Sequence, residues 1–289
     1  MTRIDIVTAV RNEEATLTAF TERVRALPRC RDVEIRIVFV EDSSEDDTLA
    51  VLRRLSDGDP SIRHYSLERG FGQGMAIIFG LSRSTADAVI MMDVDGSHPI
   101  EAIPEMIDHF SNGAEVVQCR RRSITGRHRY RDLGSAAFQR MTRCLTGVDV
   151  SDQASYFRLV SARVARELVA SPVSWRFLRF PLPPREGGKL AVIDVDSAER
   201  TQGESTYGPG RLVGMAVDGM LSLMPPVRLA IATLLGIGVT LGLGRSCWWP
   251  AGALLALALA AACWRYHTLR HLDTLDRMRV VESHEANGR

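Results

Sequence analysis

Residues 88–99 read Ala-Val-Ile-Met-Met-Asp-Val-Asp-Gly-Ser-His-Pro. The apolar beginning predicts a buried strand that ends in two carboxylates, Asp93 and Asp95. Because alternate side chains of a strand share one face, both carboxylates can converge on a hard divalent cation such as Mg²⁺ or Mn²⁺. A cation of this kind typically holds substrates through their phosphate oxygens. A pair of solvated acids at a strand end is the plain alternative, so this stretch alone leaves the choice open.

The segments before this stretch alternate strand-like and helix-like patterns, which indicates a βαβ architecture around a largely parallel sheet. Strands are predicted at 4–10, 34–40 and 88–92, with helices after Asn12 and from about Asp46. A polar cluster follows each strand, at residues 11–14, 41–44 and 93–95. One such cluster is compatible with ordinary helix capping. Three at equivalent strand ends favour a binding site, because open sheets bind substrates beyond the carboxyl ends of their strands.

The composition excludes some partners and leaves others open. The chain has 289 residues, with 36 Lys and Arg against 35 Asp and Glu, so it carries no basic footprint of a nucleic-acid binder. Its five cysteines show no Cys-x-x-Cys spacing, which favours a reducing, cytosol-facing globular part. The first residues lack the apolar core of a secretory signal, so we expect no export through the N-terminus.

Two apolar stretches near the other end, 227–243 and 247–264, predict a transmembrane helical hairpin. Each is close to the lower limit of ~17 residues for spanning hydrocarbon, and Trp248, Trp249 and Trp264 stand at their edges. A buried helical pair is the alternative. Basic residues gather outside the hairpin, whereas the connecting turn offers only Arg245. By the positive-inside tendency, we expect a multi-pass protein of the cytoplasmic membrane with both termini and the globular domain cytoplasmic.

These patterns divide the chain into three parts. We predict a globular domain at 1–223, two transmembrane helices at 224–264 and a charged cytoplasmic tail at 265–289. Pro225 and Pro226 mark the first boundary, since consecutive prolines cannot continue a helix interior. Leucines 269, 272 and 275 are spaced for a short interfacial helix. Membrane lipids are therefore expected partners, and a homo-oligomer is left open.

Several motifs occur in an order that resembles a known enzyme family. They are Val-Arg-Asn-Glu at 10–13, Val-Glu-Asp-Ser-Ser-Glu-Asp-Asp-Thr at 40–48, Arg-Gly-Phe-Gly at 69–72 with Gly80, Asp-Val-Asp-Gly-Ser-His-Pro at 93–99, and further matches at Arg120, 131–135, 152–158 and 200–207. Together they resemble the family-2 glycosyltransferases of GT-A fold, and within them the polyprenyl-phosphate glycosyltransferases related to dolichyl-phosphate mannose synthase and bacterial glucosyl carriers. The resemblance implies an α/β, Rossmann-like domain with a mostly parallel sheet, followed by a C-terminal transmembrane hairpin.

The resemblance also implies roles for individual residues. The nucleoside-diphosphate sugar is expected to contact Val10, Asn12, Glu13, Asp42, Gly70, Asp93 and Arg200. Asp93 and Asp95 are the expected ligands of Mg²⁺ or Mn²⁺, with Asp95 favoured as the direct ligand. The acceptor phosphate is expected to meet Arg120, Arg131 and Ser135, and the catalytic residues would be Asp95, Asp152 and Arg131. As alternatives, the basic run from Arg120 to Arg131 suits anionic lipid headgroups, and Asp152 suits a helix cap or an arginine partner.

The implied reaction is the inverting transfer of one sugar from a nucleoside-diphosphate sugar to a polyprenyl phosphate at the cytoplasmic membrane face. The chain lacks the Gln-x-x-Arg-Trp motif of processive polysaccharide synthases, which favours one sugar per encounter. The departures are Ser97 where the subgroup usually has Gln, Glu41 where Asp is common, and Tyr156 where Gly is usual. Two alternatives stay open, namely a membrane-anchored glycosyltransferase for a saccharide or protein acceptor, and a non-catalytic nucleotide-sugar-binding membrane protein. The sugar is not readable from the sequence.

Overall fold

The computed structural model describes residues 1–28, 32–121, 140, 154–171, 178, 188–195 and 278–284. The predicted transmembrane stretches 227–243 and 247–264 lie outside the described residues, and so do Arg131, Ser135, Asp152 and Arg200. Within the described ranges, no helix has both the length and the apolar character needed to cross a bilayer. The hairpin therefore stays a prediction.

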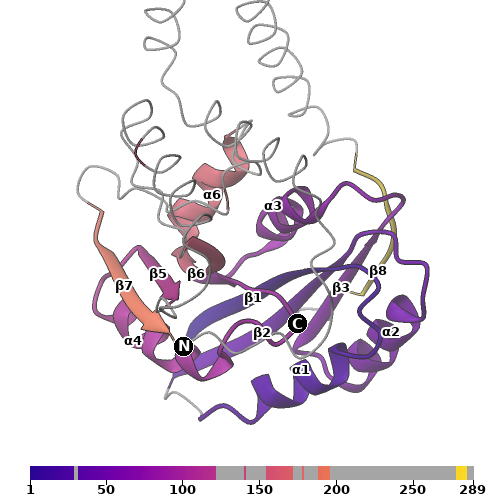
Figure 1. Ribbon diagram of the computed structural model, residues 1–289, viewed down its shortest axis with the longest axis horizontal. Coiled ribbons are helices and arrows are strands. Elements are labelled where there is room, and N and C mark those ends of the chain that lie inside the picture. The colour runs from indigo at the N-terminus through magenta and orange to yellow at the C-terminus, as the bar shows by residue number, and fades with distance from the viewer. Residues whose placement is uncertain are drawn as a thin grey trace, which may run out of the picture.

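The described residues form an eight-stranded sheet in the order β7-β5-β6-β4-β1-β2-β3-β8 (Figure 1). The strands are β1 Thr2–Val10, β2 Val33–Glu41, β3 Ile62–Leu67, β4 Ala88–Met91, β5 Val116–Arg121, β6 Ala154–Ser161, β7 Leu190–Val195 and β8 Val280–His284. The helices are α1 Leu17–Arg25, α2 Thr48–Gly58, α3 Gln73–Arg83, the short 3₁₀ helix η1 Ile100–Ala102, α4 Ile103–Ser111 and α6 Ala162–Ala170.

The centre of the sheet is parallel, as the βαβ pattern predicted. β3, β2, β1 and β4 run in one direction, because a helix crosses over between each strand and the next. β6 runs antiparallel to both β4 and β5, which makes β5 parallel to β4. The carboxyl ends of β1, β2, β4 and β5 therefore meet at one edge of the sheet.

Strand alternation divides the core into two layers. One face carries Ile4 and Ile6 and is covered by α1, α2 and α4. The other face carries Val7 and Val38 and is covered by α3 and α6. Helix α3 lies close to the sheet, since a Cβ built on Gly80 would stand 2.5 Å from Cγ1 of Val7. Gly80 thus sets how closely α3 approaches β1 and β2.

The predicted element boundaries differ from the structure at several places. β1 begins at Thr2 rather than at residue 4, β2 at Val33 rather than 34, and α2 at Thr48 rather than about Asp46. β2 runs one residue further than predicted, so Glu41 belongs to the strand. Helix α1 begins at Leu17 rather than directly after Asn12, because Glu13 first closes a turn by accepting the backbone N–H of Thr16. β4 ends at Met91 instead of Met92. The backbone N–H of Asp93 is taken by an imidazole nitrogen of His98, which leads the chain out of the ladder.

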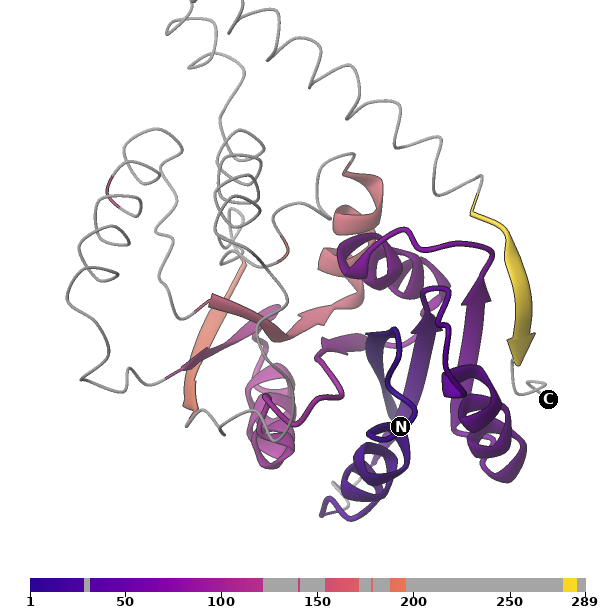
Figure 2. The same cartoon turned by 45° about the vertical axis from the view of Figure 1, so that its right-hand side comes forward.

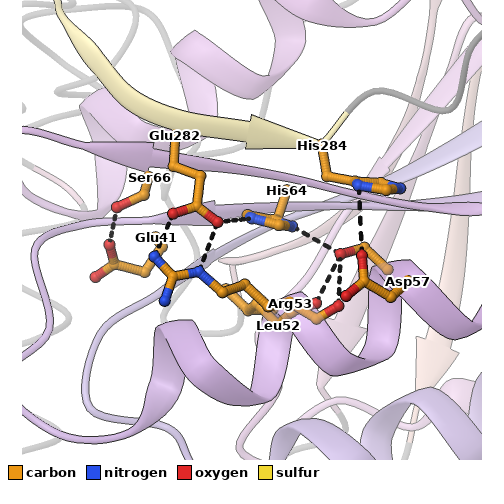
Figure 3. Close-up of polar contacts among 9 residues, drawn as sticks. Glu41, Leu52, Arg53, Asp57, His64, Ser66, Glu282 and His284 are labelled. Atoms are coloured by element: carbon orange, nitrogen blue, oxygen red, sulfur yellow. Dashed lines mark hydrogen bonds and ion pairs between the residues drawn. The ribbon is translucent and has the colours of Figure 1, made fainter.

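The last described segment adds a strand that the sequence did not predict. Residues 280–284 fall in the predicted charged tail, yet β8 pairs antiparallel with β3 at the sheet edge, as Figure 2 shows. Side chains reinforce this pairing, because Glu282 of β8 accepts from Arg53 Nε of α2 at 2.6 Å and lies 3.5 Å from His64 Nε2 of β3 (Figure 3). The tail thus contributes to the sheet. The boundaries at 223 and 264 lie outside the described residues and stay predictions.

Candidate active site

The loops that follow β1 and β2 interlock through side chains. The backbone N–H of Asn12 donates to Ser44 Oγ at 3.1 Å, and Asn12 Oδ1 accepts the N–H of Glu45 at 2.9 Å. Glu13 donates its backbone N–H to Thr48 Oγ1 at 2.8 Å. Asn12 and Ser43 both adopt positive φ, 56° and 60°, a conformation that Asn tolerates well and that Ser keeps only where its surroundings enforce it. The two predicted donor loops therefore form one unit at the carboxyl edge.

Asp42 connects this unit to the glycine-containing turn before α3. Its Oδ1 accepts the N–H of Phe71 at 2.7 Å and its Oδ2 accepts the N–H of Gly72 at 2.8 Å. Burial raises the pKa of Asp42, while these two hydrogen bonds oppose the shift. A Cβ on Gly70 would lie 2.9 Å from Nη1 of Arg11, the end of a flexible side chain, and the expected contact of Gly70 with the nucleotide sugar stays a prediction.

The Asp93–Asp95 pair is held by its neighbours rather than left as two solvated acids. Gln73 Nε2, at the start of α3, donates to Asp93 Oδ1 at 2.6 Å. Ser97 donates its backbone N–H to Asp95 Oδ1 at 2.9 Å. His98 is buried and stacks on Phe157 of β6, with ring centroids 5.1 Å apart. Both carboxylates are thus oriented at the end of β4.

The electrostatics of the site indicate an accumulation of negative charge. The pKa of Glu13 is raised, first by burial and then by the carboxylates of Asp95, Asp93 and Asp46, while a hydrogen bond from Thr16 opposes the shift. Oxygen ligands and excess negative charge fit a hard divalent cation. Among the described residues, no group of three or more His, Cys, Asp or Glu side chains is arranged to hold a metal. Asp93 and Asp95 are therefore the carboxylates that the described part of the chain offers to a cation.

The structure brings most of the described candidate residues together on connected loops, whereas Arg120 is engaged by a neighbouring strand. Asn12, Glu13, Asp42, Gly70, Asp93 and Asp95 all lie on the connected loops at the carboxyl edge, and the buried Val10 accepts the N–H of Asp42 through its carbonyl at 2.9 Å. Arg120 stands at the end of β5, where its Nε and Nη2 donate to Asp194 of β7 at 2.6 and 2.9 Å. Its predicted role at the acceptor phosphate stays a prediction.

Sequence reasoning assigned no role to three residues that shape this site. Gln73 and His98 hold Asp93, and Thr48 holds the backbone of Glu13. His98 and Thr48 stand within the motifs at 93–99 and 40–48, so the motifs pointed to them without a role. Gln73 follows the glycine turn directly, and only the start of α3 brings it to Asp93.

Comparison with solved structures defines the class of fold. The chain is similar to mannosyl-3-phosphoglycerate synthase from Rubrobacter xylanophilus, with a TM-score of 0.55, 19% identity, and 77% of this chain and 72% of that chain covered. It is also similar to glucosyl-3-phosphoglycerate synthase from Mycobacterium tuberculosis, with a TM-score of 0.52, 16% identity, and 77% of both chains covered. At these identities the likeness concerns the fold alone, which is the predicted α/β GT-A fold with its mostly parallel sheet.

Comparison of sequences then gives the family. Residues 5–169 match the model of glycosyl transferase family 2. The chain belongs to this family, and the predicted resemblance is confirmed.

Two curated relatives are each 30% identical to this chain. A prophage bactoprenol glucosyl transferase homolog of Escherichia coli aligns over 228 residues, which is 78% of this chain and 74% of the relative. An undecaprenyl-phosphate 4-deoxy-4-formamido-L-arabinose transferase of Pectobacterium atrosepticum aligns over 257 residues, which is 89% of this chain and 75% of the relative. Both names belong to the polyprenyl-phosphate subgroup that the motifs resemble.

Proposed function

We propose that this protein transfers a single sugar from a nucleoside-diphosphate sugar to a polyprenyl phosphate, with inversion at the anomeric carbon. The observation that carries the proposal is the gathering of Glu13, Asp42, Asp93 and Asp95 at one edge of the sheet. The names of the bactoprenol and undecaprenyl-phosphate relatives support the lipid-linked acceptor.

The donor would lie across the interlocked loops. Glu13 and Asp42 are carboxylates that can accept hydrogen bonds from a base N–H or a ribose hydroxyl. The backbone around Gly70 and Gly72 is accessible for close approach, since both glycines are exposed. In this arrangement Asp42 has two tasks, because its carboxylate already holds the N–H groups of Phe71 and Gly72.

Asp93 and Asp95 would hold a divalent cation together with oxygens of the donor diphosphate. When bound, the cation supplies positive charge that stabilises the departing nucleoside diphosphate. The protein's own part is to keep both carboxylates oriented before the donor arrives. Gln73 does this for the carboxylate of Asp93, the backbone of Ser97 does it for Asp95, and His98 holds the backbone N–H of Asp93. The residue at 97 acts here through its N–H, so Ser in place of the usual Gln keeps this contact.

The acceptor demands little acid–base chemistry from the protein. A phosphate monoester has a second pKa of about 6, so it is already an anion at neutral pH. Orientation and leaving-group stabilisation would then supply most of the rate. Arg120, Arg131, Ser135 and Asp152 remain the proposed acceptor and catalytic residues. Of these, only Arg120 lies among the described residues, and it shares the carboxyl edge with the donor loops.

The proposed location is the cytoplasmic face of the membrane, with the two apolar stretches as a hairpin. Strand β8 supports this topology. It follows both stretches in the sequence, yet it is hydrogen-bonded to β3 in the same sheet as β1 and β2. Residues that share one sheet lie on the same side of a membrane. If the apolar stretches cross the bilayer, they must therefore cross it an even number of times.

The test uses membranes that contain the full chain, polyprenyl phosphate and a panel of radiolabelled nucleoside-diphosphate sugars, with and without Mg²⁺ or Mn²⁺. We expect an organic-extractable product that depends on the cation and is lost in Asp95→Asn. Asp108→Asn, an exposed carboxylate on α4, is the matched control and should keep activity. Label in a water-soluble saccharide or in protein, with none in lipid, would overturn the polyprenyl-phosphate acceptor. Nucleotide-sugar binding without any product would overturn the catalytic function.

A further inference from the structure

Glu41 is a buried carboxylate that stands directly before Asp42 and is 2% exposed. Both of its oxygens are engaged. Oε2 accepts the hydroxyl of Ser66 at 2.5 Å, and Oε1 accepts the backbone N–H of Ser44 (Figure 3 draws the first contact). The carboxylate thus joins strand β3 to the turn that follows β2.

The turn that Glu41 holds is conformationally strained and central to the donor loops. Ser43 has φ of 60°, a backbone conformation that a non-glycine residue keeps only where other contacts enforce it. Ser44 uses its hydroxyl to accept the N–H of Asn12, so the same turn also fixes the loop after β1. Loss of the Glu41 contact would release Ser44 and weaken one of the contacts between the two loops, the hydrogen bond from the Asn12 N–H to Ser44 Oγ.

The geometry explains how Glu41 reaches both partners. Glu41 and Ser66 are register partners on the parallel strands β2 and β3, which places their side chains beside each other. From this position the side chain must also reach forward to the N–H of Ser44, three residues along the chain. An Asp side chain is one methylene shorter, so it cannot keep both contacts from the same backbone position. Ser66 is in turn held from the other side, because it is the register partner of Glu282 in β8.

We infer that Glu41 is a positioning residue for the donor-binding loops, anchored by Ser66, and that it acts through its reach and not through contact with the donor. The inference rests on the proposed function, since it assumes that these loops bind a nucleoside diphosphate. It adds a role for a residue that the motif comparison marked only as a substitution of Glu for Asp.

The experiment measures the affinity of the purified full chain for uridine diphosphate and guanosine diphosphate with Mn²⁺, by titration calorimetry. Four variants are compared with the parent protein, namely Glu41→Gln, Glu41→Asp, Glu41→Ala and Ser66→Ala. Gln keeps the length and can still accept from Ser44 while donating to Ser66. We expect Glu41→Gln to bind within about twofold of the parent. Glu41→Asp and Glu41→Ala should both lose about tenfold or more, equivalent to about 1.4 kcal/mol.

The matched control for Ser66→Ala is Ser84→Ala. Ser84 also donates its hydroxyl to a buried carboxylate, Asp5 Oδ2, at 2.6 Å. Asp5 lies in β1 five residues before Val10, the end of the strand that leads into the donor loop. Both Ser variants remove a hydroxyl hydrogen bond to a buried carboxylate, and Ser84→Ala also removes the acceptor of the Ala86 N–H, so thermal unfolding should report at least as large a loss of stability for Ser84→Ala. Only Ser66→Ala should weaken nucleotide binding, and in a Glu41→Ala background it should weaken binding no further.

The outcomes separate the inference from the proposed function. If the parent protein binds neither nucleotide, the inference falls, whereas the proposed function fails only if the transfer assay with the full panel of donors also gives no product. If the parent binds but Glu41→Asp binds equally well, reach is irrelevant and the inference alone is overturned. Equal losses in Glu41→Gln and Glu41→Ala would also overturn it, since a side chain of the same reach would then not be enough to hold the loops. In an active preparation, the positioning role predicts a raised KM for the donor with a smaller change in kcat.

Discussion

Asp42 Oδ2 accepts a hydrogen bond of 2.8 Å from the backbone N–H of Gly72, a residue that follows a different strand and has φ of 88°. This contact, together with the one from Phe71, fixes the turn before α3 against the end of β2. The carboxylate proposed to contact the donor is therefore also the group that holds the turn at Phe71 and Gly72 in place. Substitution of Asp42 should therefore disturb both the proposed donor contact and the turn before α3.

Asp42→Asn should lower the affinity for the donor nucleotide by at least about tenfold, because the amide replaces one of two acceptor oxygens with a donor group that faces an N–H. The parent protein should itself lose nucleotide affinity on acidification. Burial raises the pKa of Asp42, so its carboxylate is protonated at a pH above the usual Asp value of about 3.9. Calorimetric titration with nucleotide from pH 7.5 downward checks both effects. Unchanged affinity in Asp42→Asn would contradict the assignment.

Gly80→Ala should destabilise the fold although alanine is the better helix former. The helix preference is worth ~1 kcal/mol in favour of Ala. Against it, the new Cβ would lie 2.5 Å from Val7 Cγ1 and 3.0 Å from Val40 Cγ2, and overpacking of this kind costs about 1–3 kcal/mol. Both valines are β-branched and buried, so they have little freedom to move.

The control for this substitution is Gly58→Ala at the end of α2, where a Cβ meets nothing within 4 Å. Thermal unfolding of the two purified variants, followed by circular dichroism, compares them. Gly58→Ala should unfold at or above the temperature of the parent, and Gly80→Ala below it. A Gly80→Ala protein as stable as the parent would mean that α3 can move away from the sheet.

Breaking the buried ion pair between β1 and β2 should be costly. Arg36 Nε donates to Asp5 Oδ1 at 2.8 Å, and the two side chains are 6% and 1% exposed. Asp5→Asn leaves the Arg36 charge buried without its counter-charge, which typically costs about 3–5 kcal/mol. The double variant Asp5→Leu with Arg36→Met removes both charges and should recover most of that loss. Urea denaturation measures both, and a double variant weaker than Asp5→Asn would contradict this account.

Stability should fall on mild acidification because of His64. Burial lowers the pKa of His64, and His284 and Arg53 lower it further, while Glu282 opposes the shift. The unfolded chain, with a His pKa of about 6.5, then binds a proton more readily than the folded chain. This contribution is fully present above about pH 6.5 and is lost as the pH falls from there toward the lower folded value.

His64→Asn is the variant that tests this, since it removes the titrating ring. The free energy of unfolding of the parent, measured in urea at several pH values between 7.5 and 5, should decline across this window, and the slope should flatten in the variant. Glu282 is not expected to change charge there, because its pair with Arg53 lowers its pKa below the ordinary Glu value. Equal slopes in both proteins would show that another group controls the acid response.

The parts of the fold that the sequence predicted are those whose side chains face apolar layers on both sides. β1, β2 and β4 are nearly continuous apolar runs, and their buried residues 4, 6, 7, 37–40 and 88–91 show why. β3, β5, β6, β7 and β8 were not predicted. In β3 and β8, the residues His64, Ser66, Glu282 and His284 interrupt the apolar pattern. Those polar residues are accommodated by contacts with one another and with α2. Such contacts arise between elements in the folded chain and leave no periodic pattern in the sequence.

The candidate site shows the same division. The carboxylates of residues 13, 42, 93 and 95 could be predicted, since they follow strand ends and match family motifs. Their partners could not, because Gln73 reaches Asp93 only once α3 starts at that residue, and His98 reaches the backbone of Asp93 only once Gly96 turns the chain with φ of 77°. The contact between Asp42 and Gly72 likewise depends on a backbone angle that no residue pattern specifies.

The pairing of Leu67 with Val280 has a consequence for the order of folding. While the ribosome synthesises the stretch between these two residues, β3 has no partner on its outer edge, and an unpaired strand edge can recruit other chains. The remaining strands can assemble earlier, because their partners precede residue 196. A chain truncated before residue 280 would keep the residues of the donor loops and lose the strand that covers β3. We therefore expect the truncated chains to aggregate during synthesis, so that aggregation and not a loss of catalytic residues limits their activity.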